Sequence, residues 1–412
     1  MSLEPPAIAE PAPWLSLVGV GADGVTSLTP AALRAIERAK QVFGSARQLA
    51  LVAAHVRGEA RPWPSPMAPG IAELLARRGR ATCVLASGDP FYFGVGATLA
   101  ASLRVDEFTC HPAPSCVSLA AARLGWPLQD CDVVSLHGRA LSGVVRYLQP
   151  ARRMLALSWD RDTPARLAAL LVERGFGPSR LSVLERLGAA DERVLHTTAA
   201  HYELAELADL NLVALELAAT PGARLLPWRG SLPDDAFEHD GQLTKQDVRA
   251  ITLSALAPHP GELLWDVGAG AGSIAIEWAL CHPANRALAI ERDPARCERI
   301  TRNADRLGTA LVEVVEGAAP EVLARLPAPS AVFIGGGASD GDVIERCWSV
   351  LPSGGRLVLN AVSLETEALA LAAHARLGGE LRRIAIESAA PLGTMTAWRP
   401  ALPVVQWRVS KP

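Results

Sequence analysis

Short apolar runs alternate with longer amphipathic stretches along the chain, which is typical of strands separated by helices. In the first half these runs are bounded by glycine, aspartate or proline, as expected of buried strands. They are WLSLVGVG at 14–21, ATCVLAS at 81–87, CDVVSLHG at 131–138, MLALSW at 154–159, RLSVLERL at 180–187 and LNLVALEL at 210–217. A helix is predicted after the first run, with Thr29 as N-cap and Pro30 at its first position. Its apolar face is predicted to consist of Leu33, Ile36, Val42 and Phe43.

The second half repeats the alternation more regularly. Its predicted strands are LLWDVG at 263–268, ALAIER at 287–292, LVEVVEG at 311–317, AVFIGGG at 331–337 and GRLVLNAV at 355–362. A further helix is predicted to be capped by Thr244. Residues 220–242, between the halves, are rich in proline, glycine and aspartate, which indicates a boundary. A chain of 412 residues is also too long for one ordinary core. We therefore predict two different α/β domains, at 1–220 and 242–412, joined by a linker at 221–241.

The amino-acid composition argues against several classes of protein. The net charge is −3, whereas binding to nucleic acid needs a basic surface. The seven cysteines are scattered without a CxxC pair, which argues against a disulfide scaffold and a zinc site and favours a reducing, cytoplasmic location. The first residues, MSLEPPAIAEPAP, lack the features of a signal peptide, and no apolar run of about 18 residues predicts a membrane span.

The strongest chemical signal is LLWDVGAGAGS, where a strand runs into a glycine-rich turn at 268–272. Glycines let the backbone approach a nucleotide, and Glu291, at the end of the next strand, can accept hydrogen bonds from ribose hydroxyls. Ser273 stands where the dinucleotide fingerprint has Gly or Ala. Asp266, just before the turn, could hold a ligand's ammonium group. The pattern thus favours S-adenosylmethionine (SAM) over a dinucleotide.

Three loops at strand ends mark a second candidate site in the first half. They are VGVGADG around 18–24, SGDPFYFGVG at 87–96 and HPAPSCVSLAAARLG at 111–125. The first loop matches GxGxxG literally, which alone is a weak signal. The second could lie against an adenine or a methionine tail, and the third enters a helix at Ser115.

On these loops and the residues that follow them the first half resembles the tetrapyrrole (precorrin) methylases, more narrowly those that methylate carbon 5. The segments that carry the resemblance are VGVGADGVTSLTPAALRAIERAKQVFGSARQL at 18–49, SGDPFYFGVG at 87–96 and HPAPSCVSLAAARLGWPLQD at 111–130. The resemblance implies a SAM site between two α/β lobes, with contacts from Gly88, Asp89, Pro90 and Ser115. In that family the first loop faces the tetrapyrrole, which makes Asp23 a candidate substrate contact. The chain departs from the family there, because Ala22-Asp23-Gly24 replaces the frequent Pro-Gly-Asp.

The second half resembles the decarboxylating precorrin methyltransferase domain, which has the Rossmann-like class I methyltransferase fold. The motifs are QLTKQDVR at 242–249, the turn at 268–272, EGAAPE at 316–321, FIGGGA at 333–338 and LPSGGRLVLNAVSLETE at 351–367. The resemblance implies SAM contacts from Thr244, Gly268, Ala269, Gly270, Ala271, Gly272, Glu291, Gly317, Ala318 and Ala319. Gly336, among three glycines at a strand end, would leave room for a bulky ring.

The order of the two resemblances matches the fused bifunctional precorrin methyltransferases of cobalamin biosynthesis. These methylate carbons 5 and 15 of the macrocycle and remove the carboxyl group of the ring-C acetate, using one SAM site in each domain. Both related families commonly self-associate, so a homo-oligomer is expected by analogy.

Methyl transfer from a sulfonium requires orientation rather than a nucleophilic side chain. Decarboxylation needs a hydrogen-bond or proton donor at the ring, for which His239, Lys245 and Arg249 flank the Thr244 loop. A solvated linker or helix face remains the alternative for each. Arg139, Arg161 and Arg186 lie at predicted strand ends and suit forked pairing with substrate carboxylates, or are ordinary surface charges.

Two other functions stay open at this stage. A nicotinamide-dependent reductase would use the two glycine turns and Glu291, but Ser273 and the GDPFYFG loop argue against it. A SAM-sensing or tetrapyrrole-carrying module without turnover would bind the donor but release no methyl group. A nucleic-acid methyltransferase is disfavoured by the acidic charge balance.

Overall fold

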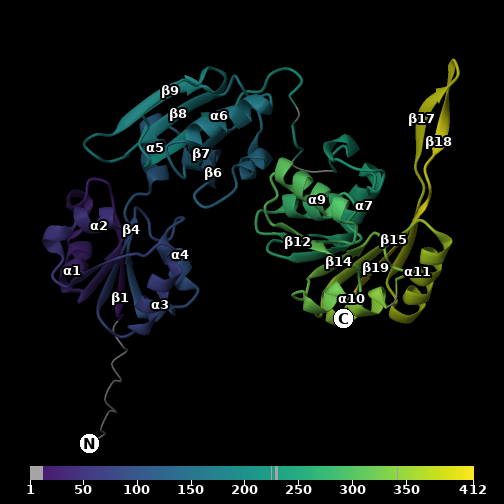
Figure 1. The fold of residues 1–412 in the computed structure, drawn as a ribbon, viewed down its shortest axis with the longest axis horizontal. Coiled ribbons are helices and arrows are strands. Elements are labelled where there is room, and N and C mark those ends of the chain that lie inside the picture. The colour runs from purple at the N-terminus through teal and green to yellow at the C-terminus, as the bar shows by residue number, and fades with distance from the viewer. Residues whose placement is uncertain (1–12, 224, 228–230, 341) are drawn as a thin grey trace, which may run out of the picture. The chain divides into compact units, whose positions relative to one another are not determined.

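The computed structural model describes residues 13–223, 225–227, 231–340 and 342–412, and it divides into two compact units (Figure 1). The first comprises residues up to Arg139 together with Gln149–Arg224; the second comprises Ala140–Leu148 and Leu225–Pro412. The N-terminal stretch MSLEPPAIAEPAP, which the sequence predicts not to be a signal peptide, lies almost entirely outside the described residues. In the described part of the chain, we find no helix with the length and apolarity that a membrane crossing requires.

The first unit contains two five-stranded sheets. The first sheet is wholly parallel, in the order β3-β2-β4-β1-β5. Its strands are β1 Leu15–Val20, β2 Gln41–Gly44, β3 Glu59–Pro62, β4 Thr82–Ser87 and β5 Phe108–His111. The helices that accompany them are α1 Pro30–Arg38, α2 Ala46–Leu51, α3 Ala68–Ala76 and α4 Val95–Ala100, with short 3₁₀ turns at Val25–Ser27, Ala53–His55 and Val105–Glu107.

The second sheet of this unit is mixed, in the order β6-β7-β10-β8-β9, with only β6 and β7 parallel. Its strands are β6 Cys131–Ser135, β7 Arg153–Leu157, β8 Arg180–Glu185, β9 Arg193–Thr198 and β10 Asn211–Glu216. The helices are α5 Cys116–Leu124 and α6 Thr163–Glu173, with 3₁₀ turns at Leu128–Asp130 and Ala199–His201. The predicted α/β fold class of the first half is confirmed.

The start of α1 is as predicted, because Thr29 accepts a hydrogen bond from the Ala32 amide and Pro30 opens the helix. The predicted apolar face is wrong beyond Ile36. The helix ends at Arg38, and Val42 and Phe43 belong to the buried strand β2. A helical spacing of apolar residues therefore crossed a turn into a strand that pairs with both β3 and β4.

The second unit is built on one seven-stranded sheet, in the order β13-β12-β11-β14-β15-β19-β16. Strands β11 to β15 run parallel, while β19 is antiparallel to its neighbours. The strands are β11 Leu263–Val267, β12 Arg286–Glu291, β13 Val312–Glu316, β14 Ala331–Ile334, β15 Arg356–Ala361, β16 Glu380–Ile384 and β19 Val404–Ser410. The helices are α7 Gln246–Leu256, α8 Ser273–Cys281, α9 Pro294–Arg306, α10 Val343–Val350 and α11 Leu364–Leu377, with 3₁₀ turns at Leu141–Tyr147, Asp234–Ala236 and Val322–Arg325. The predicted Rossmann-like sheet is confirmed.

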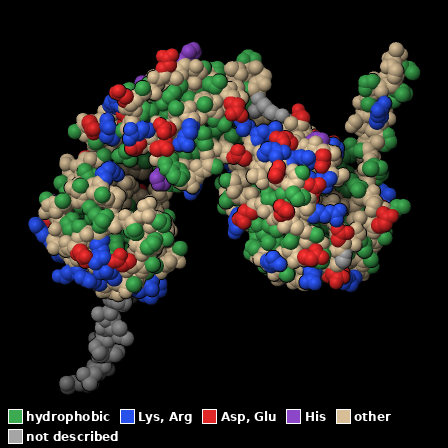
Figure 2. Space-filling model, viewed as in Figure 1, with side chains coloured by type: hydrophobic (Ala, Val, Ile, Leu, Met, Phe, Trp, Pro, Cys, Tyr) green, Lys and Arg blue, Asp and Glu red, His purple; other side chains and the backbone are tan. Residues whose placement is uncertain are grey.

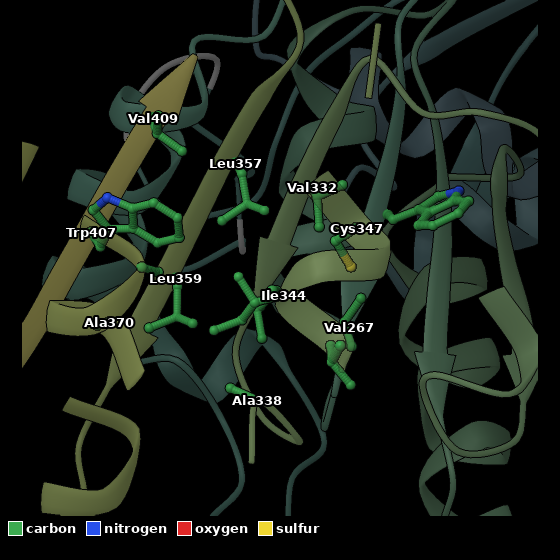
Figure 3. Close-up of a cluster of buried hydrophobic side chains, with 14 of the residues drawn as sticks. Val267, Val332, Ala338, Ile344, Cys347, Leu357, Leu359, Ala370, Trp407 and Val409 are labelled. Carbon is green, nitrogen blue, oxygen red and sulfur yellow. The ribbon is translucent and has the colours of Figure 1, made fainter. Parts of the chain in front are cut away.

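Helices cover both faces of this sheet, so its central strands β11, β14 and β15 are largely buried and apolar on both sides. On one face, side chains of α10 and α11 pack against β15 and β19 (Figure 3). The labelled members include Ile344, Cys347, Ala370, Leu357, Leu359 and Trp407. On the other face, α7 and α8 bury Leu256, Ile274 and Trp278. This packing fixes the strand ends that carry the glycine turns.

Two features of the second unit lie outside the sheet. Strands β17 Glu387–Leu392 and β18 Met395–Pro400 form a hairpin that projects from the unit (Figure 1). Part of the predicted linker also packs here, since Leu232 and Phe237 are buried in this unit against Ile276 and Leu307.

Candidate functional site

The glycine turn after β11 lies where the strand order reverses between β11 and β14, the usual ligand position in such sheets. Gly268, Gly270 and Gly272 all have positive φ, at +72°, +59° and +76°. A Cβ at Gly268 would lie 2.7 Å from the Gly336 backbone, and one at Gly270 would lie 2.8 Å from the Gln242 carbonyl oxygen. Only glycine permits this close approach of three backbone segments.

Glu291 and Asp266 are two buried carboxylates beside the turn. One Glu291 oxygen accepts from the Gly270 amide (2.8 Å), and the other accepts from the amides of Arg292 (3.0 Å) and Asp293 (3.1 Å). Asp266 accepts through Oδ2 from the Ala275 amide (2.9 Å), whereas Oδ1 has no hydrogen-bond partner among the described residues. Burial, with a smaller contribution from the Glu291 charge, raises the pKa of Asp266 to about 7. A buried acceptor without a partner points to a ligand donor at this position.

These groups line a cavity of about 1070 Å³ in the second unit. The predicted contacts that line it are Thr244, Asp266, Gly268, Ala269, Gly270, Glu291, Gly317, Ala318, Ala319 and Gly336. Ala271 and Gly272 are not part of the lining. Ala271 is fully buried, and Gly272 is the N-cap of α8, where a Cβ would lie 2.7 Å from Ile300.

The three candidate proton donors lie in different surroundings. Lys245 lines the cavity, with its Nζ 3.7 Å from Asp234. It is also the N-cap of α7, so the prediction that Thr244 caps this helix is wrong. His239 is exposed and outside the lining, with its Nδ1 accepting from the Gly241 amide (3.1 Å).

Arg249 is fully buried and outside the lining. Its Nε lies 2.6 Å from Glu277, and its Nη1 lies 3.2 Å from Asp234. It also donates to the carbonyl oxygens of Thr244 and Leu232. Its guanidinium thus ties the Thr244 loop to α8, an arrangement that supports the cavity wall rather than contacts a ligand.

In the first unit the three predicted loops meet at the ends of β1 and β4. A Cβ on Gly19 would overlap the Gly88 carbonyl oxygen and lie 2.6 Å from the Ala113 amide. Gly88 has φ +63°, and a Cβ there would lie 2.9 Å from Ser115 Cα. Ser115 caps α5 by accepting from the Ser118 amide (3.1 Å). The glycines are therefore required by backbone packing between the loops.

A cavity of about 460 Å³ opens beside these loops and is lined from both sheets of the unit. Gly88 and Ser115 line it, whereas Asp89 and Pro90 do not. The Asp89 carboxylate accepts from the Phe91 amide (2.8 Å), and Pro90 is buried, its carbonyl accepting from the Gly96 amide (2.8 Å). Both residues therefore stabilise the conformation of the loop without lining the cavity.

The predicted substrate contacts of the first unit divide in the same way. Arg139 and Arg186 line the cavity, and the Arg139 guanidinium lies 5.7 Å from the centre of the Phe93 ring. Arg186 forms an ion pair with Asp191, in which Nε lies 2.9 Å from Oδ2. Arg161 and Asp23 are outside the lining: Arg161 is paired with Asp209 (2.7 Å), and Asp23 accepts from Ser27 (2.7 Å).

Sequence reasoning missed several lining residues. In the second unit these include Gln242, Arg296, Asn360 and the hairpin base at Ile386, Ser388, Ala401 and Leu402. In the first unit they include Arg47, Tyr92, Phe93 and His137. The aromatic pair in SGDPFYFG was an available signal, whereas nothing in the SARQL segment singled out the Arg47 side chain.

Comparison with known proteins gives one consistent result. A tetrapyrrole (corrin/porphyrin) methylase model matches residues 15–203, and a precorrin methyltransferase domain model matches residues 235–411. A protein of Sinorhizobium sp. called precorrin-6Y C(5,15)-methyltransferase (decarboxylating) is 53% identical over 406 residues, covering 98% of each chain. One of the same name from Mycobacterium tuberculosis is 43% identical, covering 96% of this chain and 99% of its own.

Among solved structures, the C-terminal domain of precorrin-6Y C5,15-methyltransferase from Rhodobacter capsulatus is similar to part of the chain. It is 46% identical, with a TM-score of 0.43, and the match covers 45% of this chain and all of that domain. The full-length relatives and the two family models decide the assignment: the chain belongs to the decarboxylating precorrin-6Y C(5,15)-methyltransferase family.

Proposed function

We propose that this enzyme methylates precorrin-6Y at carbons 5 and 15 and decarboxylates the ring-C acetate, giving precorrin-8X in cobalamin biosynthesis. Membership of the family supports the reaction and the use of SAM, and the tetrapyrrole is the substrate that the family shares. The further proposal is that each unit holds its own SAM and performs one methylation. The functional domains are then 1–220, for carbon 5, and 242–412, for carbon 15 and the decarboxylation, with 221–241 between them.

The observation that carries this proposal is the pair of cavities, each built by glycine loops at strand ends of a different unit. In the second unit Glu291 would accept hydrogen bonds from the ribose, and Asp266, whose Oδ1 has no partner among the described residues, would accept from the ammonium group. In the first unit the backbone of the Gly88 and Ser115 loops would hold the donor. SAM supplies an electrophilic methyl group that passes to a nucleophilic ring carbon.

Neither cavity needs a nucleophilic side chain, because the enamine-like carbons of a reduced tetrapyrrole provide the electron pair. In the decarboxylation, the bond between the acetate methylene carbon and its carboxyl group breaks. The electron pair of that bond passes into the conjugated macrocycle, carbon dioxide leaves and a proton is taken up. Lys245 is the cavity-lining cation among the predicted donors and is best placed to hydrogen-bond the ring or deliver that proton. Arg249 acts through the Thr244 loop that it holds.

Self-association and a cytoplasmic location belong to the same proposal. The β17–β18 hairpin exposes Leu392, Met395 and Trp398, and hydrophobic side chains gather along it in the space-filling view (Figure 2). A second copy of the chain would cover such a surface. The seven cysteines are all free thiols, as suits a reducing compartment.

The test is to count SAM equivalents bound per chain by calorimetry and then to weigh the product formed from a reduced precorrin. Two equivalents are expected for the native chain and one for Gly270→Val, which should still methylate carbon 5 but leave carbon 15 and the acetate unchanged. Gly261→Val is the matched control, since Gly261 also has positive φ (+83°) but faces open space. Loss of both methylations in folded Gly270→Val, or uptake of a pyridine dinucleotide in place of SAM, would refute the two-site proposal.

A further inference from the structure

Arg47 lines the cavity of the first unit, called the first cavity below. The activity described above gives this cation no role. Its guanidinium Nη2 donates to the Ser87 hydroxyl at 3.1 Å. Among the described residues, no carboxylate forms an ion pair with Arg47, whereas Arg186 in the same wall is paired with Asp191. Burial lowers the pKa of Arg47, yet a guanidinium remains charged. The cavity wall therefore holds an exposed positive charge that has no carboxylate partner among the described residues.

The Ser87 hydroxyl is held so that its own proton is free to be donated. It accepts from Arg47 (3.1 Å) and from the side-chain Nε2 of Gln48 (3.0 Å). A hydroxyl has two lone pairs and one hydrogen, so two accepted bonds leave the hydrogen for another acceptor. Ser87 lines the cavity, where that acceptor would lie.

The orientation of Gln48 is fixed independently. Its Oε1 accepts from the Ser45 backbone amide (2.8 Å), and the Gln48 backbone amide donates to Ser45 Oγ (3.2 Å), which completes a capping box at the start of α2. Because the side-chain oxygen is committed to a backbone donor, the nitrogen must face Ser87. Gln48 is almost fully buried, so the arrangement is part of the folded structure.

The charge of the whole cavity favours an anion at this point. Its lining includes Arg47, Arg139, Arg186 and His137 and, among the described residues, no aspartate or glutamate. The cavity of the second unit differs, because five carboxylates line it together with Lys245, Arg292 and Arg296. A fork of guanidinium N–H groups beside a hydroxyl donor matches the two oxygens of a carboxylate.

We propose that Arg47 and Ser87 form a carboxylate-binding subsite that orients the reactants of the first methylation. The inference rests on the function proposed above, and two carboxylates could occupy the subsite. One is an acetate or propionate side chain of the tetrapyrrole, and the other is the carboxylate of the methionine tail of SAM. Both would be recognised by the same donors, and both would fix the distance between the methyl group and carbon 5.

The test uses the full-length enzyme with Arg47→Gln and Arg47→Lys, and with Arg34→Gln as the control. Arg34 is exposed on α1 of the same unit and is not part of the cavity wall. Calorimetry gives the SAM dissociation constant of the first site, and initial rates give KM and kcat for carbon-5 methylation. Loss of a charged hydrogen-bonding partner corresponds to a change of roughly 10- to 100-fold. Arg47→Lys should lie between the native enzyme and Arg47→Gln, because it keeps the charge but not the fork.

A raised KM for the tetrapyrrole with unchanged SAM affinity assigns the subsite to a substrate carboxylate. Weakened SAM binding assigns it to the methionine tail. If neither constant differs from that of Arg34→Gln, the subsite does not exist. Ser87→Ala removes only the hydroxyl and decides the question by the same criteria if Arg47→Gln fails to fold.

The carbon-15 methylation serves as the internal reference, and it should be unchanged in every variant. A native enzyme that methylates neither carbon would contradict the proposed function. Native activity that Arg47 and Ser87 do not influence would contradict only the subsite.

Discussion

Replacing Asp266 with asparagine is expected to stabilise the second unit at neutral pH. The native side chain is 1% exposed, one of its oxygens has no partner among the described residues, and its pKa is raised from 3.8 to about 7. Each tenfold change in proton affinity is worth about 1.4 kcal/mol, so the ionised carboxylate destabilises the folded state by about 4 kcal/mol at pH 8. Asparagine keeps an acceptor for the Ala275 amide without the charge.

The pH dependence gives this prediction its sign. Below about pH 4 the carboxyl group is protonated in both the folded and the unfolded state and contributes no difference. Between about pH 4 and pH 7 the unfolded chain loses the proton while the folded chain keeps it, so the free energy of unfolding falls as the pH rises. The fall is complete above pH 7. Asp266→Asn lacks this fall, so its advantage should grow across that interval and then level off.

Urea unfolding of the full-length protein between pH 5 and pH 8 measures the effect, and hydrogen exchange in residues 263–281 assigns it to the second unit. Asp340→Asn is the control, because Asp340 lines the same cavity but its side chain is 46% exposed. A variant as pH-dependent as the native protein, or less stable at every pH, would refute the reasoning. The same substitution should weaken SAM binding in the second unit by about 10-fold or more, since it removes the charge proposed to face the ammonium group.

Three further substitutions test the structure of the second unit. Arg249→Met should lower the free energy of unfolding by about 3–5 kcal/mol, because it leaves Glu277 buried without its partner; adding Glu277→Leu should recover much of the loss in urea titrations. Gly268→Ala should abolish SAM binding in this unit alone, measured by calorimetry, because its Cβ would lie 2.7 Å from the Gly336 backbone. Trp398→Ser, at a side chain 70% exposed, should lower the mass measured by light scattering; an unchanged mass would exclude the hairpin from self-association.

The central strands of both units could be predicted because burial on two faces leaves a nearly continuous apolar run. Strand β11 is such a run, and it leads directly into the glycine turn. The hairpin β17–β18 could not be predicted, because its strands are largely exposed and no core face imposes an alternation. Strand β2 was mistaken for helix because four residues are too few to show a period.

In the candidate sites, too, some parts could be predicted from the sequence and others could not. Backbone-built parts could be read from the sequence, since a glycine at a strand end records a close approach such as that of Gly268 to Gly336. Side-chain partnerships could not, because they join distant positions. Arg249 meets Glu277 across 28 residues, and Arg47 meets Ser87 across 40. A local pattern predicted Arg249 as a donor to the ligand, whereas the fold turns it inward.

The two cavities differ in the charges that line them, and under the proposed function each would bind SAM in a different way. The second cavity offers Asp266 and Glu291 to a donor that carries sulfonium and ammonium groups. The first offers, among its described lining, only cationic and neutral side chains, so under the proposal backbone carbonyls of the glycine loops would face the positive centres of the donor. Its arginines then remain available for carboxylates. If the backbone binds the donor and the arginines bind the substrate carboxylates, the first cavity would hold a cation beside a polyanion without competition between them. The proposed Arg47–Ser87 subsite would then serve the carboxylates.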